Sequence, residues 1–182
     1  MTQRISALSN YFLRSLLLSL TGVIYVLLGF AYWLVMFPPS QRTPDASYYI
    51  LVLAAFGVGM TFLCTLSIAS RANQGSHAPW IVRLPSRVEY LTAVLISAIL
   101  MATVLQLLLA LLALFHGPDL TLNQILLIPP IWLALNTLTA VLALHATDFI
   151  AAGWSRVYLF GIIAIFLFGQ SLNDKSGLNT WL

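Results

Sequence analysis

Five long apolar stretches, separated by short polar segments, dominate the pattern of the sequence. About 20 apolar residues in helical form cross the hydrocarbon layer of a bilayer, and a charge at its centre costs roughly 2.5–3.5 kcal/mol. The charge-free windows run over Ser15–Gln41, Ala46–Ser70, Tyr90–Pro118, Leu120–Thr147 and Val157–Asn173. The pattern therefore predicts an all-α, polytopic transmembrane bundle with about five membrane-spanning helices, near residues 15–37, 48–70, 90–115, 121–147 and 155–172.

Composition excludes an ordinary soluble domain. The 182 residues are 60% hydrophobic and 7% charged, whereas about a quarter of the residues are charged in an average globular chain. No linker or internal repeat divides the sequence, which predicts a single transmembrane domain over residues 1–182. The first apolar run is too long for the core of a cleaved signal peptide and ends in Phe37 and two prolines, so we interpret it as a permanent helix.

The distribution of basic residues predicts the orientation. Cytoplasmic loops of membrane proteins carry an excess of Lys and Arg. With a cytoplasmic N-terminus, six basic residues fall inside and two outside: Arg4, Arg14, Arg71, Arg83, Arg87 and Arg156 against Arg42 and Lys175. We therefore expect a multi-pass protein of the cell (cytoplasmic, inner) membrane, and the basic balance indicates orientation rather than binding to nucleic acid.

Two prolines interrupt the fourth window. Pro129 and Pro130 have no backbone N–H groups, so they leave carbonyls near Ile125 and Leu126 without their usual donors. Two interpretations follow from this. Either one long helix kinks at the prolines, or residues 121–128 lie in the outer interface and the crossing begins at the prolines; the kink is favoured because the alternative draws Asp148 into the membrane.

Few polar groups lie inside the apolar windows. His145 and Asp148 are three residues apart, as in a metal pair or a proton relay, but a metal site needs three or four ligands, so we expect a helix end that meets lipid headgroups. The sequence has no Ser/His/Asp set, no paired carboxylates and no phosphate-binding glycine loop. We therefore expect no catalytic residue, no metal and no cofactor in this chain.

The remaining polar and small residues in the windows indicate helix packing. Gln106 and Asn136 are amides of the kind that form hydrogen bonds between membrane helices. A sharper hypothesis is that Gln106 binds the carbonyls freed by Pro129 and Pro130, since Gln106 and this pair of prolines each lie about ten residues from the outer turn. Gly161 and Gly169 lie on one small-residue face of the last window, where helix backbones can approach closely.

A longer loop between the second and third windows, residues 71–89, carries the most informative local sequence. It contains Gly75-Ser76 and then Leu84-Pro85-Ser86-Arg87-Val88-Glu89-Tyr90-Leu91 at the start of the next helix. From Tyr48 to about Phe115, this order of parts resembles the membrane permease subunits of type II ABC exporters. In that family, a Gly-Ser/Thr pair and a Pro followed by Ser-Arg and Glu-Tyr-Leu mark a coupling helix that touches the ATPase subunit. The sequence departs from the family in two ways. It has five predicted crossings instead of six, and the stretch of chain that leads into the loop is less heavily charged.

The resemblance implies a permease that works with a separate cytoplasmic ATPase as a homo- or hetero-oligomer and moves a lipid-like substrate outward through the bilayer. The residues that it assigns to partner binding are Gly75, Ser76, Trp80, Arg83, Pro85, Arg87 and Glu89. The alternative is a non-catalytic subunit of a larger energy-transducing membrane complex, respiratory or photosynthetic. An intramembrane enzyme is a third class, which the lack of clustered ionisable residues disfavours.

Overall fold

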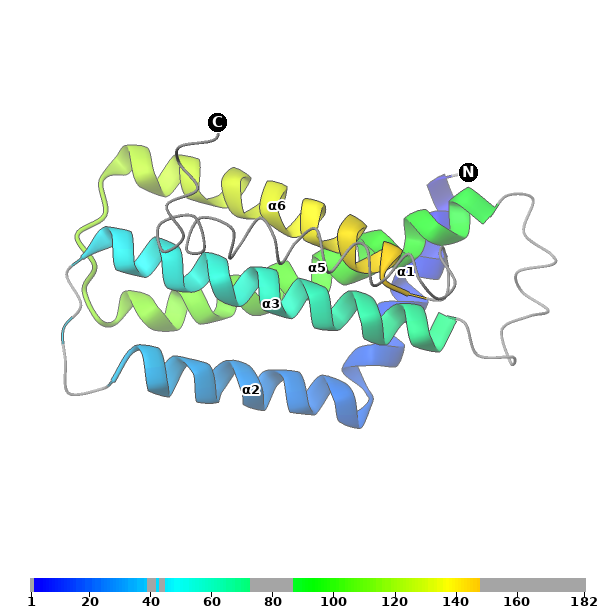
Figure 1. Ribbon diagram of the computed structural model, residues 1–182, viewed down its shortest axis with the longest axis horizontal. Coiled ribbons are helices and arrows are strands. Elements are labelled where there is room, and N and C mark those ends of the chain that lie inside the picture. The colour runs from blue at the N-terminus through cyan, green and yellow to red at the C-terminus, as the bar shows by residue number, and fades with distance from the viewer. Residues whose placement is uncertain (1, 39–41, 43–44, 73–86, 148–182) are drawn as a thin grey trace, which may run out of the picture.

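The computed structural model describes residues 2–38, 42, 45–72 and 87–147 of the chain, and every regular element among them is a helix. The helices are α1 (Thr2–Leu17), α2 (Leu20–Met36), α3 (Ala46–Ala72), α5 (Arg87–Leu114) and α6 (Leu122–His145). Figure 1 shows α3, α5 and α6 running alongside one another, with α2 beside them and α1 across one end. The expected all-α fold is confirmed for these residues, and the predicted helix at 155–172 lies outside them.

Three of these helices are apolar and long enough to cross a membrane. Among the described residues, α3, α5 and α6 have 27, 28 and 24 residues, which at 1.5 Å per residue exceeds the roughly 30 Å of a bilayer's hydrocarbon core. The bent pair α1 and α2 counts as one further candidate span if it is taken together. Many large apolar side chains of these helices are exposed, as expected where the surroundings are lipid rather than water. The protein is therefore membrane-associated.

The N-terminal region differs from the single helix predicted over residues 15–37. Residues 15–17 belong to α1, the helix breaks at Leu18 and Ser19, and the axes of α1 and α2 differ by 70°. Helix α1 is amphipathic: Phe12 and Leu16 are buried, whereas Arg4 and Arg14 are exposed. A helix with one apolar stripe and one charged face is typical of a membrane surface or of the edge of a bundle.

Serine hydrogen bonds and a glycine make the sharp break between α1 and α2 possible. Ser19 caps α2, because its hydroxyl accepts a hydrogen bond from the Gly22 backbone N–H (3.3 Å) and donates one to the carbonyl of Leu16 (2.6 Å). A Cβ atom added to Gly22 would lie 2.4 Å from that same carbonyl oxygen. Only glycine therefore allows the first turn of α2 to pack against the last turn of α1.

The core lies mainly between α3, α5, α1 and α6. Helices α3 and α5 make the most extensive contact, α6 packs on both, and α1 packs against the first half of α5. The largest fully buried side chains come from these surfaces and include Leu16, Leu53, Met60, Ile68, Val94 and Gln106. Helix α2 makes less contact with α3 and α5 than these helices make with each other.

Helix α6 runs without interruption through Pro129 and Pro130. Thr121 caps its start in a reciprocal arrangement, in which the Thr121 hydroxyl accepts from the Gln124 backbone and the Gln124 side chain accepts from the Thr121 backbone. This cap fixes the start of the helix two turns before the prolines. One continuous helix therefore includes both prolines, and a crossing that begins at them, with residues 121–128 in the outer interface, stays an alternative prediction.

The close approach at Gly22 generates a prediction. Gly22→Ala should lower the free energy of unfolding by about 1–3 kcal/mol, because the added methyl group forces the backbone of α1 away from α2. Gly59→Ala is the matched control, since Gly59 lies in α3 and a Cβ there meets nothing within 4 Å. Equilibrium unfolding in mixed micelles measures both variants. Equal stabilities for the two variants would contradict the packing described at the break.

Candidate functional site

Arg71, in the last turn of α3, binds the break between α1 and α2. Its guanidinium donates hydrogen bonds to the Ser15 carbonyl (2.9 Å), the Ser19 hydroxyl (2.7 Å) and the Thr21 hydroxyl (3.0 Å). All three acceptors are neutral, and the planar guanidinium can reach several acceptors at once in a way that an ammonium cannot. One side chain therefore fixes the end of α3 to both sides of the break.

Tyr90 joins three helices at the same end of the bundle. It lies in the first turn of α5, is buried, and donates its hydroxyl to the carbonyl of Ala72, the last residue of α3 (2.9 Å). Its ring also packs edge-on against Phe12 of α1, with 5.5 Å between the ring centroids. The end of α3 at Ala72 and the start of α5, which flank residues 73–86, are therefore held to each other and to α1.

Small side chains bring α1 close to α5. The buried Ser9 hydroxyl donates to the Ala93 carbonyl (3.3 Å), and the Ser97 hydroxyl reaches the carbonyls of Ser9 (3.2 Å) and Ala93 (2.6 Å). Small residues allow helix backbones to approach, and their hydroxyls then find partners across the contact. Together with Arg71 and Tyr90, these bonds form a junction of α1, α3 and α5, which we call the α1 junction.

A second polar cluster lies within the bundle, around Gln106 of α5. The Gln106 amide nitrogen donates to the Leu53 carbonyl of α3 (2.9 Å), and its oxygen accepts from the Asn136 side chain of α6 (2.8 Å). Both amides are 1% exposed. A Cβ at Gly57 would lie 2.3 Å from the Gln106 amide, so a glycine at that position of α3 provides the space that Gln106 occupies.

The partners of Gln106 differ from one sequence hypothesis. Gln106 makes no hydrogen bond to the carbonyls of Ile125 or Leu126 in the described part of the chain, so the hypothesis that it binds the carbonyls freed by the prolines is wrong. Its oxygen instead accepts from Asn136, which lies between one and two turns beyond Pro130 in α6. The Asn136 oxygen is itself buried, and no described residue donates a hydrogen bond to it.

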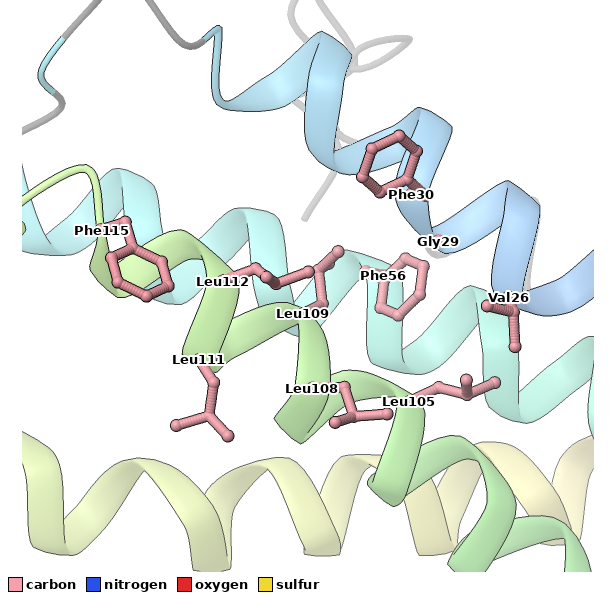
Figure 2. Close-up of a pocket in the computed structure, with 10 residues that line it drawn as sticks. All are labelled: Val26, Gly29, Phe30, Phe56, Leu105, Leu108, Leu109, Leu111, Leu112 and Phe115. Atoms are coloured by element: carbon pink, nitrogen blue, oxygen red, sulfur yellow. The ribbon is translucent and has the colours of Figure 1, made fainter.

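An apolar groove of about 310 Å³ separates α2 from α3 and α5. Figure 2 shows its side chains: Phe56 projects from α3 toward Gly29 of α2, and a series of leucines follows α5. The lining residues are Val26, Gly29, Phe30, Phe56, Leu105, Leu108, Leu109, Leu111, Leu112 and Phe115. No polar or charged side chain is among them, so the groove favours an apolar occupant.

Two buried polar atoms, on residues next to the groove residues Phe30 and Phe115, have no hydrogen-bond partner among the described residues. Trp33, whose ring is 5.5 Å from that of the groove residue Phe30, also packs against His116, with 5.7 Å between centroids. The Trp33 indole nitrogen and His116 Nδ1 are both buried without a hydrogen-bond partner. His116 is 7% exposed and directly follows Phe115, the groove residue just beyond the end of α5. Buried polar atoms normally have partners, so these two atoms are exceptions among the described residues.

The structure describes only some of the site residues expected from the sequence. Glu89 is 6% exposed in the first turn of α5, and its Oε2 has no hydrogen-bond partner among the residues that the structure describes. Arg87 is the first residue of α5. The other expected partner-binding residues, Gly75, Ser76, Trp80, Arg83 and Pro85, and the packing glycines Gly161 and Gly169 lie outside the described residues.

The pair His145 and Asp148 is described only in part, because Asp148 lies outside the described residues. His145 is exposed, and its Nδ1 lies 2.8 Å from the Val141 carbonyl, a contact typical of a helix end. Within the described ranges, no group of three or more His, Cys, Asp or Glu side chains could hold a metal ion.

Sequence reasoning missed the α1 junction and the groove. The signal for α1 was available, because apolar residues recur at Ile5, Leu8, Phe12 and Leu16 with helical spacing. No sequence signal identifies Arg71 as the residue that binds the break. Its position at the end of an apolar window is equally typical of a basic residue that only sets the orientation in the membrane. The groove depends on the angle at which α2 leaves the break, which the sequence does not encode locally.

Comparisons with protein-family models, with curated proteins and with solved structures find no match to this chain. The local sequence and the geometry of the α1 junction and the groove are therefore the evidence for a function.

The role of Arg71 can be tested with a charge-conserving substitution. Arg71→Lys should lower the free energy of unfolding by about 1–2 kcal/mol, because Nη1 binds Ser15 and Nη2 binds Ser19 and Thr21, and the single nitrogen of an ammonium cannot occupy both positions. Amide hydrogen exchange in α1 should also become faster. Arg14→Lys is the control, because Arg14 is exposed on α1. If α1 exchanges at the same rate in both variants, Arg71 does not hold the break.

Proposed function

We propose that this chain is the permease subunit of an ABC-type exporter. In this proposal, it crosses the cytoplasmic membrane several times with its N-terminus inside, forms an oligomer and works with a separate ATPase subunit. Its substrate is lipid-like or hydrophobic. The chain itself performs no catalysis, and ATP hydrolysis belongs to the partner.

The observation that carries the proposal is the placement of Tyr90. It belongs to the Glu-Tyr-Leu part of the sequence that resembles the exporter permeases, and it binds the last carbonyl of α3 and the Phe12 ring of α1. A coupling segment must pass a displacement from the ATPase to the membrane helices. A partner that moved residues 73–86 would move the ends of α3 and α5 directly, and α1 with them through Tyr90 and Ser9.

The α1 junction connects this end to the groove. Arg71 binds both sides of the break between α1 and α2, and α2 forms one wall of the groove with Val26, Gly29 and Phe30. Because α2 makes less contact with α3 and α5 than they make with each other, it is the wall that can move at the lowest cost in lost packing. A displacement at residues 73–86 would therefore change the width of an apolar groove, as the export of a hydrophobic substrate requires.

The experiment replaces both arginines of the proposed docking segment by lysine. Arg83→Lys with Arg87→Lys retains the charge that sets orientation but removes the bidentate geometry of guanidinium contacts. Co-purification of the cytosolic ATPase and stimulation of its hydrolysis should fall at least about tenfold, which corresponds to roughly 1.4 kcal/mol of binding free energy. The double change Arg4→Lys with Arg14→Lys is the matched control, because both arginines are exposed on α1, and it should retain the partner.

Two results would contradict the proposal. In the first, the docking variant binds and stimulates the ATPase as well as the control does. In the second, no ATPase associates with the unmodified protein, and redox or pigment subunits co-purify instead, which would favour the alternative of a non-catalytic subunit of an energy-transducing complex.

A further inference from the structure

We propose that the outward face of α1 binds the headgroups of anionic phospholipids at the membrane surface. The inference requires only that the long helices cross a membrane, so it holds whether or not the chain pairs with an ATPase. Three observations carry it: the position of α1 at the ends of two long apolar helices, the residues on its exposed face, and the single sign of the charges around it.

Helix α1 lies at the depth of the lipid headgroups. Its axis differs from that of α2 by 70°, and Figure 1 shows it across one end of the bundle. Arg71 in the last turn of α3 reaches the Ser15 carbonyl of α1, and Tyr90 in the first turn of α5 packs on Phe12. Helix α5 has 28 residues and is about 42 Å long, which matches the roughly 40–45 Å of a bilayer that includes its headgroups. The first turns of α5, and α1 beside them, therefore lie among the headgroups.

The exposed face of α1 combines basic residues with large apolar and aromatic ones. The opposite side of the helix is occupied, because Phe12 and Leu16 are buried in the bundle. Intervals of three, four and seven residues place a set of exposed side chains on one outward face: Arg4, Tyr11, Arg14 and Leu18. A helix that presents this mixture is typical of the interface between headgroups and acyl chains, where tyrosine is also enriched.

The charges around this face are of one sign. The sequence has no Asp or Glu before Asp45 and none between Asp45 and Glu89, so α1, α2 and α3 contain no acidic residue. Arg71 adds a further cation at the break, and its acceptors among the described residues are neutral. Glu89, in the first turn of α5, is 6% exposed and does not reach the outward face of α1. A basic surface at headgroup depth attracts anionic lipids.

The leucines at the break favour a lipid surface over an acidic protein. Leu17, Leu18 and Leu20 are 51%, 88% and 77% exposed. In a bilayer these side chains enter the acyl region while phosphates bind the arginines, so one partner covers both parts of the face. An acidic protein would match the charge but would leave the leucines without an apolar partner. Each basic residue near an anionic surface strengthens binding roughly fivefold, so the loss of one arginine is measurable.

Quenching by nitroxide lipids tests the proposal. The full chain carries Cys64→Ala and a fluorophore on Ala7→Cys, an exposed position between Arg4 and Arg14. It is reconstituted in vesicles of equal parts phosphatidylcholine and phosphatidylglycerol, in which either lipid bears the same nitroxide close to its headgroup. Labelled phosphatidylglycerol should quench at least threefold more strongly than labelled phosphatidylcholine, and high salt should remove the difference. Equal quenching by the two lipids, or no quenching by either because a second copy or another protein covers the face, would overturn the proposal.

A matched pair of substitutions localises the selectivity. Arg14→Gln should reduce the ratio of the two quenching constants at least twofold, whereas Arg42→Gln, which removes an exposed charge between α2 and α3 at the opposite end of the bundle, should leave the ratio unchanged. Arg14→Lys should restore the ratio, because charge rather than guanidinium geometry attracts the headgroups. Quenching by phosphatidylcholine should be the same in all variants, which shows that α1 has kept its depth. An equal effect of Arg14→Gln and Arg42→Gln, or a fall in quenching by both lipids in Arg14→Gln, would contradict a headgroup site on α1.

Discussion

The buried amide of Gln106 is the interaction on which the arrangement of the long helices depends. In apolar surroundings, an unpaired amide costs several kcal/mol, so Gln106 constrains every helix that supplies it with a partner. It binds the Leu53 carbonyl of α3 and the Asn136 side chain of α6. A shift of either helix by one residue along its axis would break one of these bonds, so the cluster sets the register of three helices.

The same register positions the groove. Leu105 lines the groove and directly precedes Gln106 on α5, and Phe56 lines the groove and directly precedes Gly57 on α3. On each of these two helices, a residue of the groove wall is therefore adjacent to a residue of the polar contact. The space at Gly57 lets the amide reach α3, and α3 then holds Phe56 against α2. At the other end, Arg71 and Tyr90 connect these helices to α1. The groove, the Gln106 cluster and the α1 junction are therefore connected through α3 and α5, so a shift of either helix would affect all three.

Sequence reasoning predicted the apolar helices because the membrane imposes a simple rule, that charges lie outside long apolar windows. The windows around residues 48–70, 90–115 and 121–147 coincide with α3, α5 and α6, and Gln106 and Asn136 were recognised as polar groups between helices. The specific partners were not predictable, because Gln106 could equally have bound the carbonyls freed by Pro129 and Pro130. The choice depends on the crossing of α3 over α5, which no single window encodes.

The break between α1 and α2 was missed for a related physical reason. Composition shows where a chain is apolar, but the break depends on Ser19 and Gly22 together with Arg71, which is 52 residues from Ser19 in the sequence. Likewise, Glu89 was assigned to partner binding from the local sequence alone, and the burial of its side chain in α5 was not predictable from that sequence. Side-chain direction at a helix start depends on tertiary packing rather than on local sequence.

A double-mutant cycle on Gln106 and Asn136 tests the central claim most directly. Each single change, Gln106→Leu and Asn136→Leu, leaves the other amide buried without its partner, whereas the double change removes both amides. If the pair fixes α5 to α6, the free energies of unfolding in mixed micelles should give a coupling energy of about 0.6–1.7 kcal/mol, the range found between membrane helices. Effects that add within about 0.3 kcal/mol would show that the two amides act independently and would contradict the account.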